Sequence, residues 1–220
     1  MKKDFAVGLL GGSFNPAHGG HRRMSIAALG RLGLDEVWWL VSPQNPLKPE
    51  AGMAPHAARM AAARKVARHP RIRVSAIEAE LGTRRTVDTL RALQRRFPQV
   101  RFLWLMGADN LQQFHRWASW REIARLVPIV VLARPPHSGR RHAAPALSWL
   151  GRHVHRRASN WRNWKLPGVA MVDYGLDRRS ATAIRAAHPD WARSGRPHLK
   201  PDPATTGDPM RQQRTQEAIA

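Results

Sequence analysis

The sequence contains no cysteine and only 15 acidic residues, against 37 lysines and arginines. The lack of cysteine excludes disulfides, thiolate zinc sites, iron–sulfur clusters and a cysteine nucleophile. No apolar run approaches the roughly 20 residues that cross a bilayer. The start of the chain lacks the apolar stretch and cleavage site of a signal peptide. We therefore expect a cytoplasmic protein without a membrane partner.

The scarcity of acid leaves a formal net charge of +22 on 220 residues. Nearly all of the basic residues are arginine, whose planar fork suits phosphate and carboxylate groups. An anionic partner would explain this excess, and so would a solvated arginine-rich surface with no ligand. The length and the 43% hydrophobic content indicate one compact domain, with or without a short appendage.

Short apolar runs alternate with segments of helical periodicity. Strands are expected at 5–10, 36–42, 71–77, 100–106, 128–133 and 169–172, and helices at 21–32, 54–69, 87–97, 120–126 and 180–187. This alternation predicts an α/β fold, Rossmann-like and doubly wound, with a mainly parallel sheet and helices on both faces. Ligands of such sheets bind outside the carboxyl ends of the strands. The turns 11–21, 42–48 and 107–110, together with Arg134, follow strands and are expected to converge on one crevice.

Two regions depart from the alternation. Residues 123–172 contain no acid, and 134–168 reads as a basic helical excursion rich in tryptophan. From residue 189 to 220 the chain is rich in Pro, Gly and Arg, so we expect a poorly structured tail after a domain spanning 1–188.

The segment Gly-Gly-Ser-Phe-Asn-Pro-Ala-His-Gly-Gly-His at 11–21 carries the sharpest chemical signal. Glycines after a buried strand let the backbone approach a phosphate, and the next helix begins with unpaired N–H groups. His18 and His21 stand three residues apart at that helix start and can face the same anion. The pair can equally hold a metal ion or cap the helix.

This segment resembles the first signature of the nucleotidyltransferase superfamily, usually G-G-x-F-D-P-x-H-x-G-H. Residues 5–187 are similar to the bacterial nicotinate-nucleotide adenylyltransferase family, because further motifs follow in the same order. They are the strand exit and lysine at 38–48, Arg-Thr-Val-Asp-Thr-Leu at 85–90, Gly-Ala-Asp-Asn-Leu at 107–111, Phe-His-Arg-Trp at 114–117, Arg-Pro at 134–135 and Ser-Ala-Thr-Ala-Ile-Arg at 180–185.

The resemblance implies adenylyl transfer from ATP to nicotinate mononucleotide, which yields nicotinate adenine dinucleotide and pyrophosphate in NAD biosynthesis. His18 and His21 are then the catalytic residues that stabilise charge on the phosphoryl oxygens. The residues expected to bind ATP are Gly11, Gly12, Ser13, Phe14, Gly107, Asp109, Arg134, Ser180, Thr182 and Arg185. Mg²⁺ is the expected cofactor, held through the phosphates rather than by a protein metal site.

For the acceptor, the resemblance implies Asn15, Lys48, Thr86 and Trp117, with the Trp117 ring against the pyridine. Each has a plainer interpretation from the residues alone. Trp117 can be a core aromatic, Thr86 a helix N-cap and Lys48 a solvated side chain, and Asp109 of the ATP set can be a turn residue.

Three departures from the family pattern stand out. Asn15 replaces the usual aspartate, Pro136-His137 stands where glycine commonly follows the Arg-Pro pair, and the family's usual C-terminal helix is not recognisable. The alternatives kept open are adenylyl transfer to nicotinamide mononucleotide or phosphopantetheine and, in a different class, a basic nucleic-acid-binding protein, which ranks behind the enzyme. Formation of a homo-oligomer also stays open.

Overall fold

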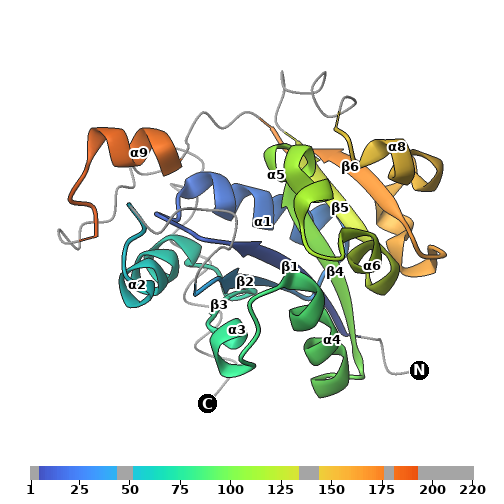
Figure 1. The fold of residues 1–220 in the computed structure, drawn as a ribbon, viewed down its shortest axis with the longest axis horizontal. Coiled ribbons are helices and arrows are strands. Elements are labelled where there is room, and N and C mark those ends of the chain that lie inside the picture. The colour runs from blue at the N-terminus through green and yellow to red at the C-terminus, as the bar shows by residue number, and fades with distance from the viewer. Residues whose placement is uncertain (1–4, 44–51, 134–143, 176–180, 193–220) are drawn as a thin grey trace, which may run out of the picture.

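The computed structural model describes residues 5–43, 52–133, 144–175 and 181–192. Its centre is a six-stranded sheet in the order β3-β2-β1-β4-β5-β6, with every neighbouring pair parallel (Figure 1). The strands are β1 (Phe5–Gly12), β2 (Glu36–Val41), β3 (Ile72–Ser75), β4 (Val100–Gly107), β5 (Ile129–Ala133) and β6 (Val169–Asp173). The predicted α/β fold and parallel sheet are confirmed.

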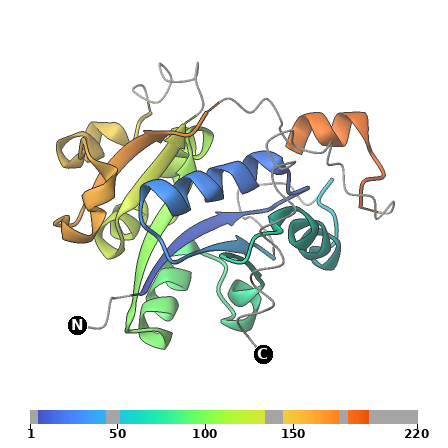
Figure 2. The same ribbon diagram turned by 180° about the vertical axis from the view of Figure 1, so that it is seen from behind.

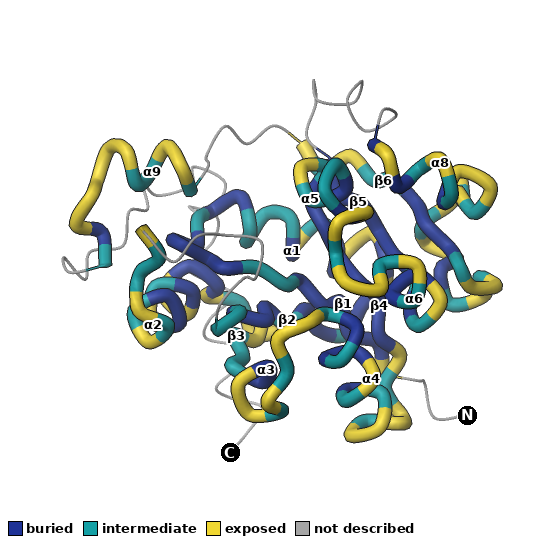
Figure 3. Tube along the Cα trace, viewed as in Figure 1, coloured by how far each residue is buried: buried dark blue, intermediate teal, exposed yellow. Residues whose placement is uncertain are grey.

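The strands are apolar because both faces of the sheet are covered. In β1, Ala6 and Leu10 pack into the core on one face, and Val7 and Leu9 pack into the core on the other. The buried central strands run through the middle of the molecule, and exposed residues lie mainly on the helices and loops outside them (Figure 3).

The helices divide between the two faces. The first core contains side chains of α1 (Gly19–Arg31), α2 (His56–Ala67) and the 3₁₀ segment η3 (Ala158–Asn163). The second contains side chains of α3 (Ile77–Glu80), α4 (Thr86–Arg96), α5 (Ala108–Gln113), η1 (Phe114–Arg116), α6 (Trp120–Leu126) and α8 (Leu147–Leu150). Figures 1 and 2 show the sheet from its two sides, with α9 (Ala181–Ala187) set apart from it at the end where α2 lies.

Three local expectations differ from the structure. The strand expected to reach residue 77 ends at Ser75, whose hydroxyl accepts a hydrogen bond from the Ile77 N–H at 3.1 Å as α3 begins. Residues 107–110 do not form a free turn, because Gly107 ends β4 and is the N-cap of α5. The helix expected from residue 21 begins earlier, at Gly19, and Gly33 follows its end with φ of +59°.

The tryptophans of the basic excursion are used in packing. Trp161 is buried and donates from Nε1 to the carbonyl oxygen of Leu32 at 2.9 Å, and Trp149 lies edge-on to Trp120. Trp164 stacks on His155 with ring centroids 4.3 Å apart. Within the described part of this stretch, the helical pieces are α8, η2 (Gly151–His153) and η3. Residues 134–143, and 193–220 of the tail, lie outside the described residues.

Candidate active site

A cleft of about 530 Å³ opens at the carboxyl ends of β1 and β4, where the strand order reverses. This is the position at which doubly wound sheets bind their ligands. Segments far apart in sequence meet there. The residues that line the cleft include Gly11, Gly12, Ser13, Phe14, Asn15, His18, His21, Glu78, Arg84, Arg85, Thr86, Gly107, Asp109, Arg116, Trp117, Thr182 and Arg185.

The two histidines form one unit at the start of α1. His18 is the N-cap, and its Nδ1 accepts from the Gly20 N–H at 3.1 Å. The His18 N–H in turn donates to Nδ1 of His21 at 3.2 Å, and the two ring centroids lie 4.0 Å apart. Since both Nδ1 atoms accept, the proton of each neutral ring sits on Nε2. Capping of the helix and a place in the cleft are therefore compatible, because they use opposite sides of the ring.

Aromatic rings pack against the loop between β1 and α1. Phe14 has φ of +46°, a left-handed conformation that costs a non-glycine residue about 1 kcal/mol. Its ring stacks on Trp39 at 5.1 Å and lies 4.9 Å from the His21 ring, so this packing holds the strained backbone in place. Phe14 lines the cleft but is only 3% exposed, which makes it chiefly a support for His21.

At two positions of the cleft wall, a glycine lets a neighbouring side chain approach closely. A Cβ on Gly11 would lie 2.6 Å from Cη2 of Trp104, and a Cβ on Gly107 would lie 2.3 Å from Oδ1 of Asp109. Real Cβ atoms do not come that close, so both glycines admit a neighbouring side chain. At Gly107 this allows the Asp109 carboxylate to lie over the end of β4.

Asn15 joins three segments around the cleft. Its Nδ2 donates to the carbonyl oxygen of Gly52 at 2.9 Å, and its Oδ1 accepts from the Ala54 N–H at 3.1 Å. Its own carbonyl oxygen accepts from Nη1 of Arg185 at 2.6 Å. The family pattern has aspartate at this position, and an ionised carboxylate cannot donate to Gly52. The asparagine amide therefore forms a hydrogen bond that aspartate could not form.

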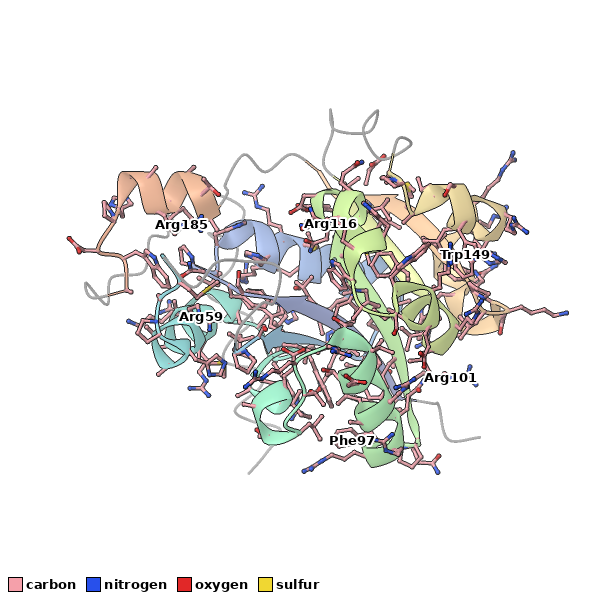
Figure 4. The ribbon with its side chains drawn as sticks, viewed as in Figure 1. Arg59, Phe97, Arg101, Arg116, Trp149 and Arg185 are labelled. Carbon is pink, nitrogen blue, oxygen red and sulfur yellow. The ribbon has the colours of Figure 1, made fainter. Side chains whose placement is uncertain are left out.

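Arg59 supports the same loops from behind. It is 1% exposed, and its guanidinium donates to the carbonyl oxygens of Ser13, Ser42 and Pro43 at 2.7 Å each and of Ala54 at 2.9 Å. Burial lowers the pKa of Arg59. One side chain thus ties the exits of β1 and β2 to the entry of α2. Figure 4 shows Arg59, Arg116 and Arg185 on three separate elements.

On the acceptor side, Thr86 is the first residue of α4 and follows the N-cap Arg85. The alternative interpretation of Thr86 as the helix N-cap is therefore wrong by one position, and Thr86 lines the cleft. Trp117 lines the cleft, and its ring also packs edge-on against Trp104 and Phe114, with ring centroids 6.0 Å and 5.4 Å apart.

Three of the predicted site residues, Lys48, Arg134 and Ser180, lie outside the described residues. Sequence reasoning missed Arg59, Glu78, Arg84, Arg85 and Arg116. Arg59 could have been found, because it shares the spacing of Ala63 and Val66 on the buried stripe of α2. Glu78 carried no such signal in its four-residue helix.

The positive groups lining the cleft suit a ligand with several phosphates. Within the described residues, no three His, Asp or Glu side chains come together as metal ligands. None of the helices there is both long enough and apolar enough to span a bilayer.

Comparison with known proteins adds to this geometry. The cytidylyltransferase-like family pattern matches residues 9–187. The chain is 57% identical over 194 residues to the "Probable nicotinate-nucleotide adenylyltransferase" of Erythrobacter litoralis, covering 87% of this chain and 88% of that one. It is 61% identical over 182 residues to a protein of the same name from Cereibacter sphaeroides, covering 82% and 96%.

The fold also matches a solved structure at low sequence identity. Plasmodium falciparum nicotinic acid mononucleotide adenylyltransferase, solved in complex with NaAD, superposes with a TM-score of 0.59 at 13% identity over 83% of each chain. This likeness supports the fold, whereas the bacterial relatives and the matched motifs decide the family. The chain belongs to the nicotinate-nucleotide adenylyltransferase family of cytidylyltransferase-like proteins.

Proposed function

We propose that this chain transfers the adenylyl group of ATP to nicotinate mononucleotide. The acceptor's phosphate oxygen bonds to the α-phosphorus of ATP, the bond from that phosphorus to the β-phosphate oxygen breaks, and pyrophosphate leaves. The products are nicotinate adenine dinucleotide and pyrophosphate. The observation that carries the proposal is that one cleft joins His18 and His21 to Trp117 on one side and to Arg185 on the other.

In this reaction the protein mainly positions groups and neutralises charge. His18 and His21 donate from Nε2 to the phosphoryl oxygens, with Gly11, Gly12 and Ser13 forming the backbone wall beside them. Thr182 and Arg185 bind the β- and γ-phosphates, and Asp109 with Gly107 binds the adenosine ribose. We extend the phosphate set to Ser180 and Arg134 from their positions in the sequence motifs.

The acceptor lies on the Thr86 and Trp117 side of the cleft. The Trp117 ring stacks on the pyridine, and the first turn of α4 with Thr86 meets the ring carboxylate. Asn15 orders the loop between the two substrates. Lys48 is assigned to phosphate binding from its position in the sequence motif. Mg²⁺, bound by the phosphates of ATP, supplies further charge neutralisation when present.

The reaction is tested by product identification. Purified protein incubated with Mg-ATP and nicotinate mononucleotide is expected to form a dinucleotide with the mass of nicotinate adenine dinucleotide, with one pyrophosphate per dinucleotide. A His18→Ala/His21→Ala double variant serves as the control preparation. Absence of the dinucleotide with the unaltered protein would overturn the proposal.

A further inference from the structure

A buried carboxyl group lines the cleft and is unused by the proposed mechanism. Glu78, on α3, is 7% exposed and faces the same cleft as Thr86 and Trp117. Its Oε1 lies 3.3 Å from Oγ1 of Thr89, which stands one helical turn after Thr86 on α4. Glu78 is therefore placed beside the helix turn to which we assign the acceptor ring.

Glu78 has no basic partner within the described ranges of this strongly basic chain. Two other acids are differently placed: Asp88 of α4 lies 3.5 Å from Arg91, and Glu36 of β2 pairs with Arg73 at 2.6 Å. Glu80, on the same short helix, is exposed. The other charged or titratable groups on the cleft wall are His18, His21, Arg84, Arg85, Asp109, Arg116 and Arg185.

Burial without a cation favours the neutral acid. The Glu78 carboxyl is largely removed from water, and no basic side chain within the described residues compensates its charge. The one side-chain hydrogen bond that it accepts there comes from Oγ1 of Thr89 at 3.3 Å, and this bond favours the ionised form. Burial is the larger effect and raises the pKa of Glu78 to about 7, with the Thr89 hydrogen bond opposing it.

We propose that Glu78 is a specificity-determining residue for the acceptor: as a neutral acid it favours a ring carrying an anionic carboxylate, and its ionisation shifts preference towards a ring carrying a carboxamide. The physical reason is direct. A neutral carboxyl can donate a hydrogen bond to a carboxylate, whereas an ionised one repels it and can accept from an amide N–H. This inference rests on the proposed function.

The test is the ratio of kcat/KM for nicotinate mononucleotide to kcat/KM for nicotinamide mononucleotide, followed from pH 6 to 8.5. The two acceptors share the same phosphate and the same ATP, so the titration of these groups cancels in the ratio. If the protonated form is required, the ratio is expected to fall roughly tenfold between pH 7 and 8.5.

Glu78→Gln is expected to flatten this profile and to keep its low-pH selectivity at pH 8.5, because glutamine is neutral and can still donate. The matched control is Glu80→Gln on the same helix, which is expected to keep the unaltered profile. A structural role alone would change the rates with both acceptors but would not change the pH dependence of their ratio.

The profile of the unaltered protein can refute the proposal even if the Glu78 variant does not fold. A ratio that is constant with pH, or a Glu78→Gln profile that falls like the unaltered one, would overturn the inference while leaving adenylyl transfer intact. Absence of turnover with both acceptors would overturn the proposed function and this inference together.

Discussion

The guanidinium of Arg59 donates to the carbonyl oxygen of Ser13 at 2.7 Å, although the two residues stand 46 positions apart. Ser13 lies in the loop before His18 and His21, and Arg59 lies on α2 and does not itself line the cleft. The histidine loop and the exit of β2 are thus held by one buried cation. Arg59 therefore affects the active site only through the backbone carbonyl groups to which it donates.

Replacing Arg59 by methionine is expected to lower the free energy of unfolding by about 3–5 kcal/mol, because one buried and three partly buried hydrogen bonds to a charged donor are lost. Arg59→Lys keeps the charge but not the planar fork, so a smaller loss is expected. Urea unfolding measures both. Arg64→Met, at an exposed position of the same helix, is the control and should change stability by less than about 0.5 kcal/mol. An equal effect at both positions would refute the role given to Arg59.

Asn15→Asp tests the amide that the structure requires. The carboxylate keeps the bond from the Ala54 N–H but cannot donate to Gly52, so the stability should fall by about 1–2 kcal/mol at neutral pH. Asn110→Asp makes the same chemical change on the cleft wall, at a side chain that has no hydrogen bond within the described residues. In thermal unfolding, the Tm of Asn15→Asp should lie clearly below the Tm of Asn110→Asp. Unchanged stability of Asn15→Asp would contradict the account.

His18→Ala is expected to lower kcat by about 10²–10³, because one donor to the developing charge is lost. His18 also caps α1, so part of the effect could come from the helix. His18→Asn separates the two roles, since asparagine is a good N-cap but has no imidazole. Its stability should stay near that of the unaltered protein while kcat remains low. Near-normal turnover by His18→Ala would refute the catalytic assignment.

Trp117→Ala is expected to raise KM for nicotinate mononucleotide at least about tenfold, because a base–aromatic stack contributes roughly 1–3 kcal/mol. KM for ATP should change little. Trp117→Phe retains an aromatic face, so its KM for nicotinate mononucleotide should lie between the values of the unaltered protein and of Trp117→Ala. Steady-state kinetics with each substrate varied in turn provides the comparison. Equal increases in both KM values would show that Trp117 acts only through its packing on Trp104 and Phe114.

The buried acid gives a stability prediction that does not depend on activity. An ordinary glutamate releases its proton near pH 4.5, whereas folded Glu78 keeps it to about pH 7. Between these values the folded chain binds the extra proton, so the stability that Glu78 contributes is complete below about pH 4.5 and is lost as the pH rises towards 7. Relative to Glu78→Gln, the unaltered chain should lose about 3 kcal/mol over this range. Parallel pH dependence of unfolding in the two proteins would contradict the assignment.

The sequence predicted what depends on periodicity and on local motifs. The apolar strands, the parallel sheet and the convergence of 11–21 with 107–110 follow from alternation and from the rule that strand ends share one edge. The histidine pair at a helix start was also found, because both its glycines and its spacing are local.

What the sequence did not predict depends on distant partners. Glu78 acquires its character from burial against Thr89, and Arg59 from four carbonyl groups on three segments. Neither environment leaves a pattern near the residue itself. The helix α5 was taken for a turn because Gly107 and Asp109 favour turns in isolation, whereas here Gly107 is the N-cap of a helix.

The central claim is adenylyl transfer with selection for the nicotinate acceptor. It is tested most directly by pyrophosphate release from Mg-ATP at neutral pH with nicotinate mononucleotide, nicotinamide mononucleotide and phosphopantetheine supplied in parallel. The account predicts rapid release with the first, much slower release with the second and none with the third. Equal or greater release with either of the other acceptors, or no release with any, would contradict it.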